Sequence, residues 1–320
     1  MMPRPVKSPT SHRRVVLLGP QRHVPIVRPA VADLCGGAPA PVALVTAGWE
    51  EREAEDAEFR EHLGRPVVNL EIWSRVERIF ERDPELLAAM RERHDRLRRT
   101  QALYRLRLDG LVGAAQELLR RTDDLELVAP ELDGALQMLQ ALDREHQARI
   151  AELHRAFDAR WRPAARAAVQ QHKRELQELL DGAACLCIAG GHVGVLLHRL
   201  QLFDLLGLWG ERPLCAWSAG AMVLGERIVL FHQLQGLGVD TEVMEAGLGV
   251  VRGIVPLPHA RRRLDLHDAA ALRLLARRFL PDPCILLDDG HRIDWDGRSW
   301  HARAGTRRLQ QDGSVQEVAT

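Results

Sequence analysis

Short apolar runs separated by polar segments occupy the start of the chain. They cover residues 15–18, 41–46 and 66–73. The first two end at the turns Gly19-Pro20 and Ala47-Gly48. Short buried strands that alternate with helices are typical of a parallel sheet. We therefore expect three strands here, with a charged helix over about 50–62 between the second and the third.

The pattern changes between about residues 79 and 181, where apolar residues recur at helical spacing and strand signals are almost absent. Asp83, Pro84 and Glu85 form a typical helix start, because a capping Asp precedes a Pro and an acid in the first turn. Gly182 is a typical helix stop. The predicted helices cover about 84–100, 101–121, 130–160 and 163–181. This segment is therefore predicted to be a helical insertion between strands.

After Gly182 the strand and helix pattern resumes. Strands are predicted over 183–189, 213–217, 228–231 and 249–251, helices over 193–206 and 265–279, and β-hairpins from 284 to 318. The predicted fold class is α/β: a three-layer sandwich with a mostly parallel sheet and an inserted α-helical subdomain. The predicted organisation is a disordered basic tail at 1–14, an α/β hydrolase-like domain at 15–80 and 182–320, and a helical insertion at 81–181.

Composition excludes several classes of protein. Among 320 residues, Lys plus Arg equals Asp plus Glu at 44 each, so the chain lacks the basic character of a nucleic-acid-binding protein. Residues 1–14 contain no apolar run, so we expect no signal peptide there, and no run approaches the ~18 apolar residues that span a membrane. The five cysteines include no CxxC pair, which indicates buried free thiols in a reducing cytoplasm. We expect a cytoplasmic protein.

Metal-ligand patterns in the helical segment are weak. Glu92 and His94, and likewise Glu152 and His154, are two positions apart and so point to different helix faces. The spacing of His172 and Glu175 suits one face, but a di-iron carboxylate centre needs several such pairs. The sequence therefore predicts no metal site and no cofactor.

Ser218 directly follows a predicted strand and precedes small residues at 219–221. Such a turn fits either a nucleophile held at the carboxyl edge of a sheet or a simple helix N-cap. Two other features favour the nucleophile. Gly190 and Gly191 also end a strand, so their backbone amides can approach a ligand. His259, 41 positions after Ser218, lies in a loop stiffened by prolines and can act as a base.

The ordered segments GGH, AWSAGAM, GLGVV, PLPHA and ILLDDGHRIDWDG resemble those of the S51 serine peptidases, which include aspartyl dipeptidase (peptidase E) and cyanophycinase. The resemblance covers about residues 183–300, and the first three strands match in order only. It implies a class I glutamine amidotransferase-like fold and a serine hydrolase that needs no metal. It also implies that Ser218 is the nucleophile, that His259 is the base, and that the amides of Gly191 and Ala219 form the oxyanion hole.

Two parts of the family pattern are less clear in this chain. Gln233 and Gln235 stand where the family's acid is expected; Asp240 is the first alternative, followed by Glu242 and Glu245. A substrate carboxylate would need a cation, for which Arg227 or Arg261 is available. The predicted substrate-binding residues are Gly190, His192, Trp217, Arg227 and Arg261.

The first functional hypothesis is a serine hydrolase that cleaves a peptide, isopeptide or related amide bond. The alternative is a catalytically degraded, amidotransferase-like binding protein whose helical insertion mediates a partner or dimer interaction. The expected partner is a small peptide or amide substrate, with neither nucleic acid nor membrane involved. The helical insertion is interpreted as a lid, a dimerisation arm or a partner-binding surface, so a homodimer formed through it is among the expected assemblies.

Overall fold

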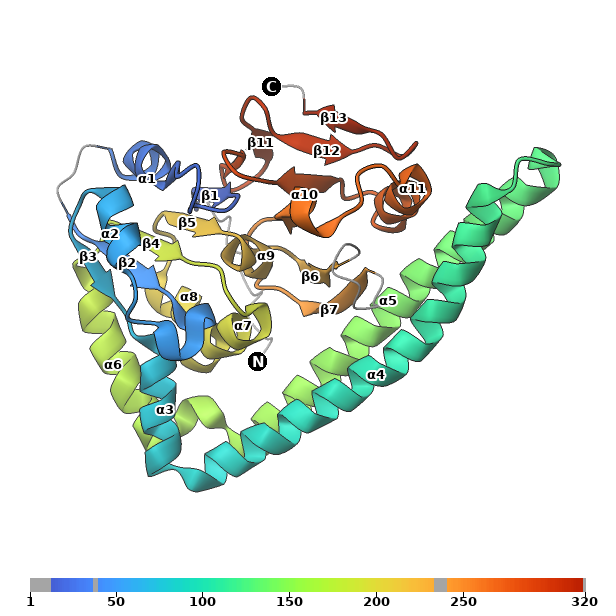
Figure 1. The fold of residues 1–320 in the computed structure, drawn as a ribbon. Coiled ribbons are helices and arrows are strands. Elements are labelled where there is room, and N and C mark those ends of the chain that lie inside the picture. The colour runs from blue at the N-terminus through green and yellow to red at the C-terminus, as the bar shows by residue number, and fades with distance from the viewer. Residues whose placement is uncertain (1–12, 37–39, 233–240, 319–320) are drawn as a thin grey trace, which may run out of the picture.

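A seven-stranded, mostly parallel sheet forms the centre of the molecule (Figure 1). The computed structural model describes residues 13–36, 40–232 and 241–318. The strands run in the order β11-β10-β1-β5-β4-β2-β3, and only β10 and β11 are antiparallel to their neighbours. The bounds are β1 Val15–Leu18, β2 Val42–Val45, β3 Val67–Asn69, β4 Cys185–Ile188, β5 Leu214–Trp217, β10 Arg292–Trp295 and β11 Trp300–Ala302.

Helices cover both faces of this sheet, which explains why its central strands are apolar throughout rather than alternating. Every residue of β1, β2, β4 and β5 is buried. One face packs against α1 and α2, and the other against α3 and α6 to α9. The bounds are α1 Val27–Cys35, α2 Ala57–Leu63, α3 Ile72–Arg82, α6 Ala167–Asp181, α7 Val193–Phe203, α8 Leu205–Trp209 and α9 Ala219–Leu224. The predicted α/β class with a mostly parallel sheet is confirmed.

A second sheet and a hairpin complete the α/β body. The four-stranded sheet has the order β13-β12-β9-β8, and β8 and β9 are parallel. A separate hairpin pairs β6 with β7. The bounds are β6 Arg227–Leu230, β7 Glu242–Ala246, β8 Val255–Pro258, α10 Ala260–Arg263, α11 Ala269–Arg278, β9 Cys284–Leu287, β12 Arg307–Leu309 and β13 Val315–Glu317.

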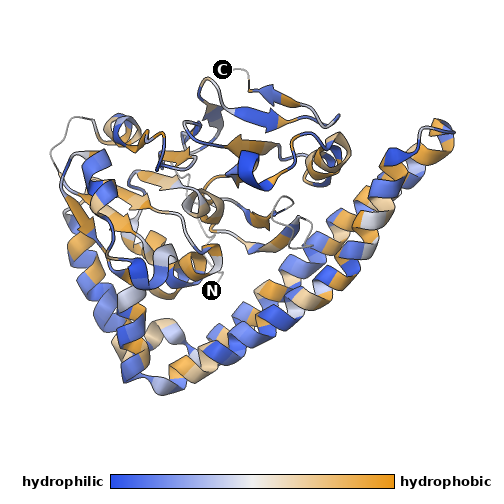
Figure 2. Cartoon of the chain, in the orientation of Figure 1, coloured by the Kyte–Doolittle hydropathy of each residue, from blue (hydrophilic) through white to orange (hydrophobic). Residues whose placement is uncertain are grey.

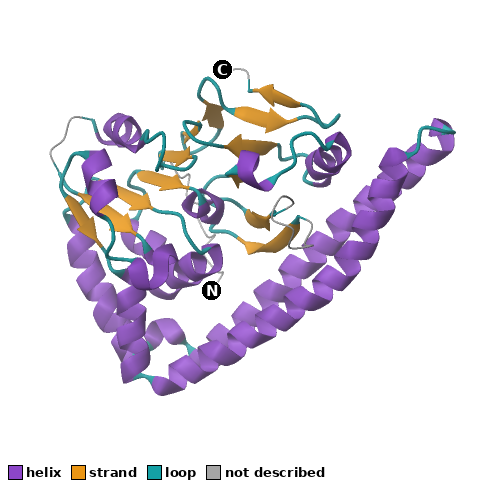
Figure 3. Ribbon diagram, viewed as in Figure 1, coloured by secondary structure: helices purple, strands orange, loops and turns teal. Residues whose placement is uncertain are grey.

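A long antiparallel helical hairpin extends from the body, and its tip lies well beyond it (Figures 1 and 3). It consists of α4 (Pro84–Arg120) and α5 (Leu125–Trp161). Hydrophobic and hydrophilic residues alternate along both helices (Figure 2). Within the described ranges, no helix combines the length and the apolar character that a membrane crossing requires.

The predicted helix break at residues 100 and 101 is wrong, because α4 continues through it. Neither position holds a Gly or a Pro, so nothing in the backbone stops the helix there. The predicted start at Pro130 is also wrong: α5 begins at Leu125 and contains Pro130. Proline fixes φ at a helical value, so it removes one hydrogen bond here without ending the helix.

Sequence patterns misplaced several shorter elements. Helix α1 was not predicted. It contains Pro29 in its first turn, where the missing N–H costs little. The predicted strand at 249–251 is absent from the described structure. Gly249 has a φ of 63°, and the N–H groups of Val250 and Val251 instead donate to the carbonyl of Leu224 at the end of α9. The predicted helix over 50–62 is divided into η1 (Ala47–Arg52) and α2.

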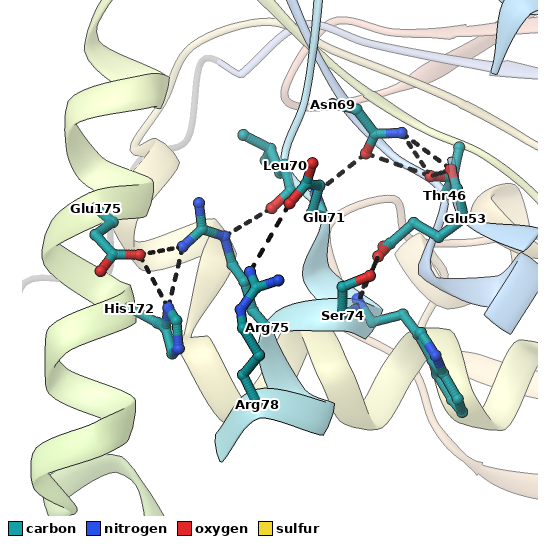
Figure 4. A network of polar contacts seen from close by, with 11 residues as sticks. Thr46, Glu53, Asn69, Leu70, Glu71, Ser74, Arg75, Arg78, His172 and Glu175 are labelled. Carbon is teal, nitrogen blue, oxygen red and sulfur yellow. Dashed lines mark hydrogen bonds and ion pairs between the residues drawn. The ribbon is translucent and has the colours of Figure 1, made fainter. Parts of the chain in front are cut away.

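The third predicted strand is shorter than expected because side chains begin a helix within it. The Oδ1 of Asn69 accepts from the N–H of Glu71, and the buried carboxylate of Glu53 accepts from those of Trp73 and Ser74 (Figure 4). These acceptors satisfy the free N–H groups at the start of α3.

A second part of the same network ties α3 to α6. Arg75 on α3 bonds the carboxylate of Glu175 and lies 3.1 Å from Nδ1 of His172 (Figure 4). His172 and Glu175 therefore belong to a structural ion-pair network. The five cysteines are free, and all but Cys35 are buried, as expected.

Candidate active site

Ser218 occupies a sharp turn between β5 and α9, at the carboxyl edge of the central sheet. Its φ of 53° and ψ of −122° are rare for a residue with a side chain, and such strain is concentrated at functional sites. The small residues after it are needed for packing: a Cβ on Gly220 would lie 2.3 Å from the carbonyl oxygen of Ile188 in β4. This is the local geometry of a nucleophile elbow.

His259 lies beside this serine. Its Nε2 is 3.1 Å from Oγ of Ser218, which is hydrogen-bond distance. The segment before it is strand β8 rather than the expected loop, and His259 itself has a φ of 60°. Its N–H donates to the carbonyl of Leu287 in the neighbouring parallel strand β9, so its backbone is fixed by the second sheet.

The strand end at Gly190 and Gly191 borders the same turn. A Cβ on Gly190 would lie 2.7 Å from Cβ of Ser218, and one on Gly191 would lie 2.1 Å from the carbonyl oxygen of Gly48. Neither position has space for a side chain. The N–H groups of Gly191 and Ala219 have no hydrogen-bond acceptor among the described residues. Two free donors beside a serine suit the stabilisation of an oxyanion.

A pocket of about 450 Å³ opens over the serine–histidine pair. Trp217 lines it and stacks on Phe59, with ring centroids 5.0 Å apart. Sequence patterns did not single out the charged and aromatic residues that the loop after β1, the short helix η1, the turn after η1 and helix α2 bring to the pocket. These are Arg22, Trp49, Arg52, Glu55, Glu58 and His62.

Only two of the five predicted substrate-binding residues, Gly190 and Trp217, line this pocket. The ring of His192 caps α7, where its Nδ1 accepts from the N–H of Val195. Arg227 forms an ion pair with Asp282, 2.5 Å away, and Arg261 lies exposed on α10. The structure therefore does not bring these three side chains to the pocket.

Neither of the two candidate acids that the structure describes, Glu242 and Glu245, lies beside His259. Asp240, Gln233 and Gln235 lie outside the described residues. Glu242 binds Arg105, and Glu245 binds His154 and His198, so both are committed elsewhere. In the described ranges no carboxylate accepts a hydrogen bond from the His259 ring.

Charges around His259 nevertheless shift its pKa. Burial lowers the pKa of His259, and the positive charges of Arg263 and Arg262 lower it further, whereas Asp289 and Asp288 act in the opposite direction. Both acids follow β9, whose carboxyl end lies beside that of β8. Oδ1 of Asp289 is buried and has no hydrogen-bond partner within the described part of the chain. In the sequence, the only signal for acids near His259 was the pair Asp288 and Asp289 directly after an apolar run.

Together these features define an α/β protein with a paired serine and histidine at the carboxyl edge of a mostly parallel sheet. No protein-family model matches the chain, and a search of curated proteins finds no match. Its fold is similar to the crystal structure of a peptidase from an acI-B1 Actinobacterium, with 16% identity, a TM-score of 0.48 and coverage of 96% of this chain and 95% of that one. A second similar structure is a putative peptidase E protein from Listeria monocytogenes EGD-e, with 12% identity, a TM-score of 0.42 and coverage of 93% and 99%.

Proposed function

We propose that this protein is a serine hydrolase that cleaves a peptide, isopeptide or related amide bond. The observation that carries the proposal is the 3.1 Å contact between Oγ of Ser218 and Nε2 of His259, formed where a strained turn enters a pocket of about 450 Å³. A hydroxyl bonded to an imidazole at the carboxyl edge of a sheet is the arrangement that activates a serine.

In the proposed reaction, Oγ of Ser218 attacks the substrate carbonyl while His259 takes the hydroxyl proton. The lowered pKa of His259 keeps the ring neutral at neutral pH, in the form that can accept a proton. The N–H groups of Gly191 and Ala219 hold the oxyanion, and His259 then gives the proton to the leaving amine. Water hydrolyses the acyl-enzyme by the same steps. Asp289 and Asp288 stabilise the imidazolium by charge alone.

One cation on the pocket wall, Arg22, suits a substrate that carries a carboxylate. Arg22 is exposed at the pocket and has no ion-pair partner among the described residues, whereas Arg52 is paired with Glu55. A guanidinium without a partner can bind a carboxylate through two hydrogen bonds. We propose that Arg22 takes the place that the sequence suggested for Arg227 or Arg261. An acidic residue beside the cleaved bond would agree with the S51 resemblance.

The alternative, a binding protein that has lost catalysis, is favoured by one specific observation. No carboxylate in the described ranges holds the ring of His259, and loss of that partner lowers the rate of a serine hydrolase by orders of magnitude. In that case the pocket would bind its ligand without cleaving it, and the helical hairpin would serve a partner. A cytoplasmic location and a homodimer through the hairpin stay proposals under either function.

Labelling with a fluorophosphonate, read by intact mass, separates the two functions. We expect one adduct on the wild type and none on Ser218→Ala or His259→Ala. Ser299→Ala is the matched control, because Oγ of Ser299 also lies 3.1 Å from a histidine nitrogen, in His301, but on an exposed hairpin. It should label like the wild type. A folded wild-type protein that stays unlabelled would contradict the hydrolase and favour the binding function.

A further inference from the structure

Two histidines and a glutamate converge between the helical hairpin and the α/β body. His154 comes from α5, His198 from α7 and Glu245 from β7. Nε2 of His154 lies 2.8 Å from Oε2 of Glu245, and Nε2 of His198 lies 2.9 Å from Oε1. One donor atom from each residue lies within 4.8 Å of the other two. Three elements far apart in the sequence thus place two imidazoles and one carboxylate around a common point.

This cluster lies on the wall of a cavity of about 730 Å³, separate from the serine pocket. The two cavities share no lining residue. The side chain of Glu245 is 6% exposed, and those of His154 and His198 are 18% and 19% exposed. The carboxylate is therefore held inside, while the imidazoles reach the cavity and leave room beside them for a further ligand.

We propose that His154, His198 and Glu245 bind a divalent transition-metal ion of the zinc class. Neutral imidazole and carboxylate are ligands that Zn²⁺ prefers, and two histidines with one acid form a three-ligand set that leaves a coordination position open. Here the open position faces the cavity. The sequence predicted no metal site, so none of these three residues was expected to bind a metal ion.

The hydrogen bonds within the cluster are consistent with this role. One oxygen of Glu245 lies at hydrogen-bond distance from each imidazole, so the carboxylate is already oriented toward both. A metal ion would replace the imidazole protons that now hold the three side chains together. A purely structural hydrogen-bond network, by contrast, would have no affinity for metal.

Charge in the cavity also indicates the ligand at the open position. The lining contains Arg93, Arg155 and Arg162 against the acids Asp158 and Glu245. Nε of Arg93 is buried and has no hydrogen-bond partner among the described residues. Adding a divalent cation to this wall makes it strongly positive. We therefore expect the open position to accept an anion, a carboxylate or a phosphate, and Arg93 to bind it.

The position of the cluster gives the ion a structural consequence. His154 belongs to the helical hairpin, whereas His198 and Glu245 belong to the body, so a bound ion would cross-link the two. A ligand that binds the folded state alone raises its stability by mass action. Metal should therefore raise the thermal midpoint of unfolding of the wild type.

The experiment uses the full-length protein stripped of metal with a chelator and then titrated with Zn²⁺ and, separately, with Co²⁺. We expect calorimetry to show one tightly bound equivalent of Zn²⁺, and Zn²⁺ to raise Tm. Bound Co²⁺ should show the intense d–d absorption of a four- or five-coordinate ion. His154→Ala, His198→Ala and Glu245→Gln should each weaken Zn²⁺ binding at least about 10-fold, the lower range for loss of groups that support a metal site.

His94→Ala is the matched control, because this exposed histidine lies on α4 of the same hairpin. It should keep the equivalent of Zn²⁺. The titrations of the wild type need no variant, so a folding defect in a mutant does not remove the test. A wild type that binds no Zn²⁺, gives only the weak spectrum of hydrated Co²⁺, or keeps its affinity in all three variants would overturn the proposal. Inorganic phosphate added to the Co²⁺ form should change its spectrum in the wild type and less in Arg93→Met.

Discussion

His259 is the residue whose protonation should control the proposed reaction. Only the neutral ring can take the proton of Ser218, so labelling by a fluorophosphonate should fall as pH drops through the pKa of His259. That pKa is lowered from its ordinary value of about 6.5. We therefore expect the acid limb of the labelling rate to lie below about pH 6.5.

The charges around His259 allow the sign of this effect to be tested. Arg263→Met removes a positive charge that disfavours imidazolium, so it should raise the pKa of His259 and move the acid limb to higher pH. Asp289→Asn removes a negative charge and should move the limb to lower pH. Labelling rates measured from pH 4 to 8 would show the shifts. Equal limbs in all three proteins would mean that these charges do not act on His259.

Gly190 is predicted to be essential because of its contact with the serine. A Cβ there would lie 2.7 Å from Cβ of Ser218, so Gly190→Ala must displace the nucleophile. Small displacements of reacting groups cost about 10²-fold in rate, and we expect a labelling rate reduced by about that factor. Gly110→Ala is the control, because a Cβ at Gly110 on α4 would meet nothing within 4 Å. Equal rates for the two variants would contradict the packing argument.

At the scale of elements, a buried polar network joins the hairpin to helix α11. The guanidinium of Arg278 donates to both oxygens of Asp143 on α5, at 2.7 and 2.6 Å, and to the hydroxyl of Tyr104 on α4, at 2.8 Å. All three residues are buried. Removing one partner of such a network leaves an uncompensated charge in the interior.

Asp143→Ala should therefore lower the free energy of unfolding by about 3–5 kcal/mol. Chemical denaturation followed by circular dichroism would measure it. Glu145→Ala is the matched control: Glu145 also lies on α5 and pairs with Arg107 and Arg149, but these pairs are on the surface. Surface ion pairs contribute little, so the control should stay near the wild type. Similar decreases in the free energy of unfolding in both variants would show that the buried network stabilises the fold no more than the surface pairs do.

Elements whose signals are local could be predicted from the sequence. The strands around Ser218 and Gly190 were found because apolar runs end directly at small residues, and a nucleophile elbow needs that order. The start of α4 at Pro84 was found through its capping Asp83. Helix α1 was missed; no side chain caps its start after Ile26, so the sequence holds no capping signal there.

Sites built by the meeting of distant elements could not be predicted in this way. The pocket arginines Arg22 and Arg52 come from the first part of the chain, far from Ser218 in sequence. His154 and Glu245 are 91 positions apart, so spacing along a helix could not reveal them as a pair. Arg227 was a reasonable cation by position, but the fold turns it toward Asp282.

At the scale of the whole molecule, the hairpin presents apolar side chains to solvent. Leu103 and Leu106 on α4 are 61% and 72% exposed, and Met138 on α5 is 58% exposed. The inner faces of the two helices already form their own core, which includes Leu108, Leu136 and Leu139. The exposed Leu103, Leu106 and Met138 are therefore not part of the core that holds the two helices together. A second hairpin could cover them by forming a helical bundle.

A homodimer through the hairpin should have twice the 36.0 kDa mass of the chain in light scattering coupled to size exclusion. Burying each leucine contributes roughly 1.5–3 kcal/mol, so Leu103→Lys with Leu106→Lys should convert the dimer to monomer. Val24→Lys changes an exposed apolar residue outside the hairpin and should leave the mass unchanged. A wild-type protein with the mass of one chain, 36.0 kDa, would refute the dimer. Because neither leucine lies near Ser218, the double variant should also keep its fluorophosphonate adduct, which separates assembly from catalysis.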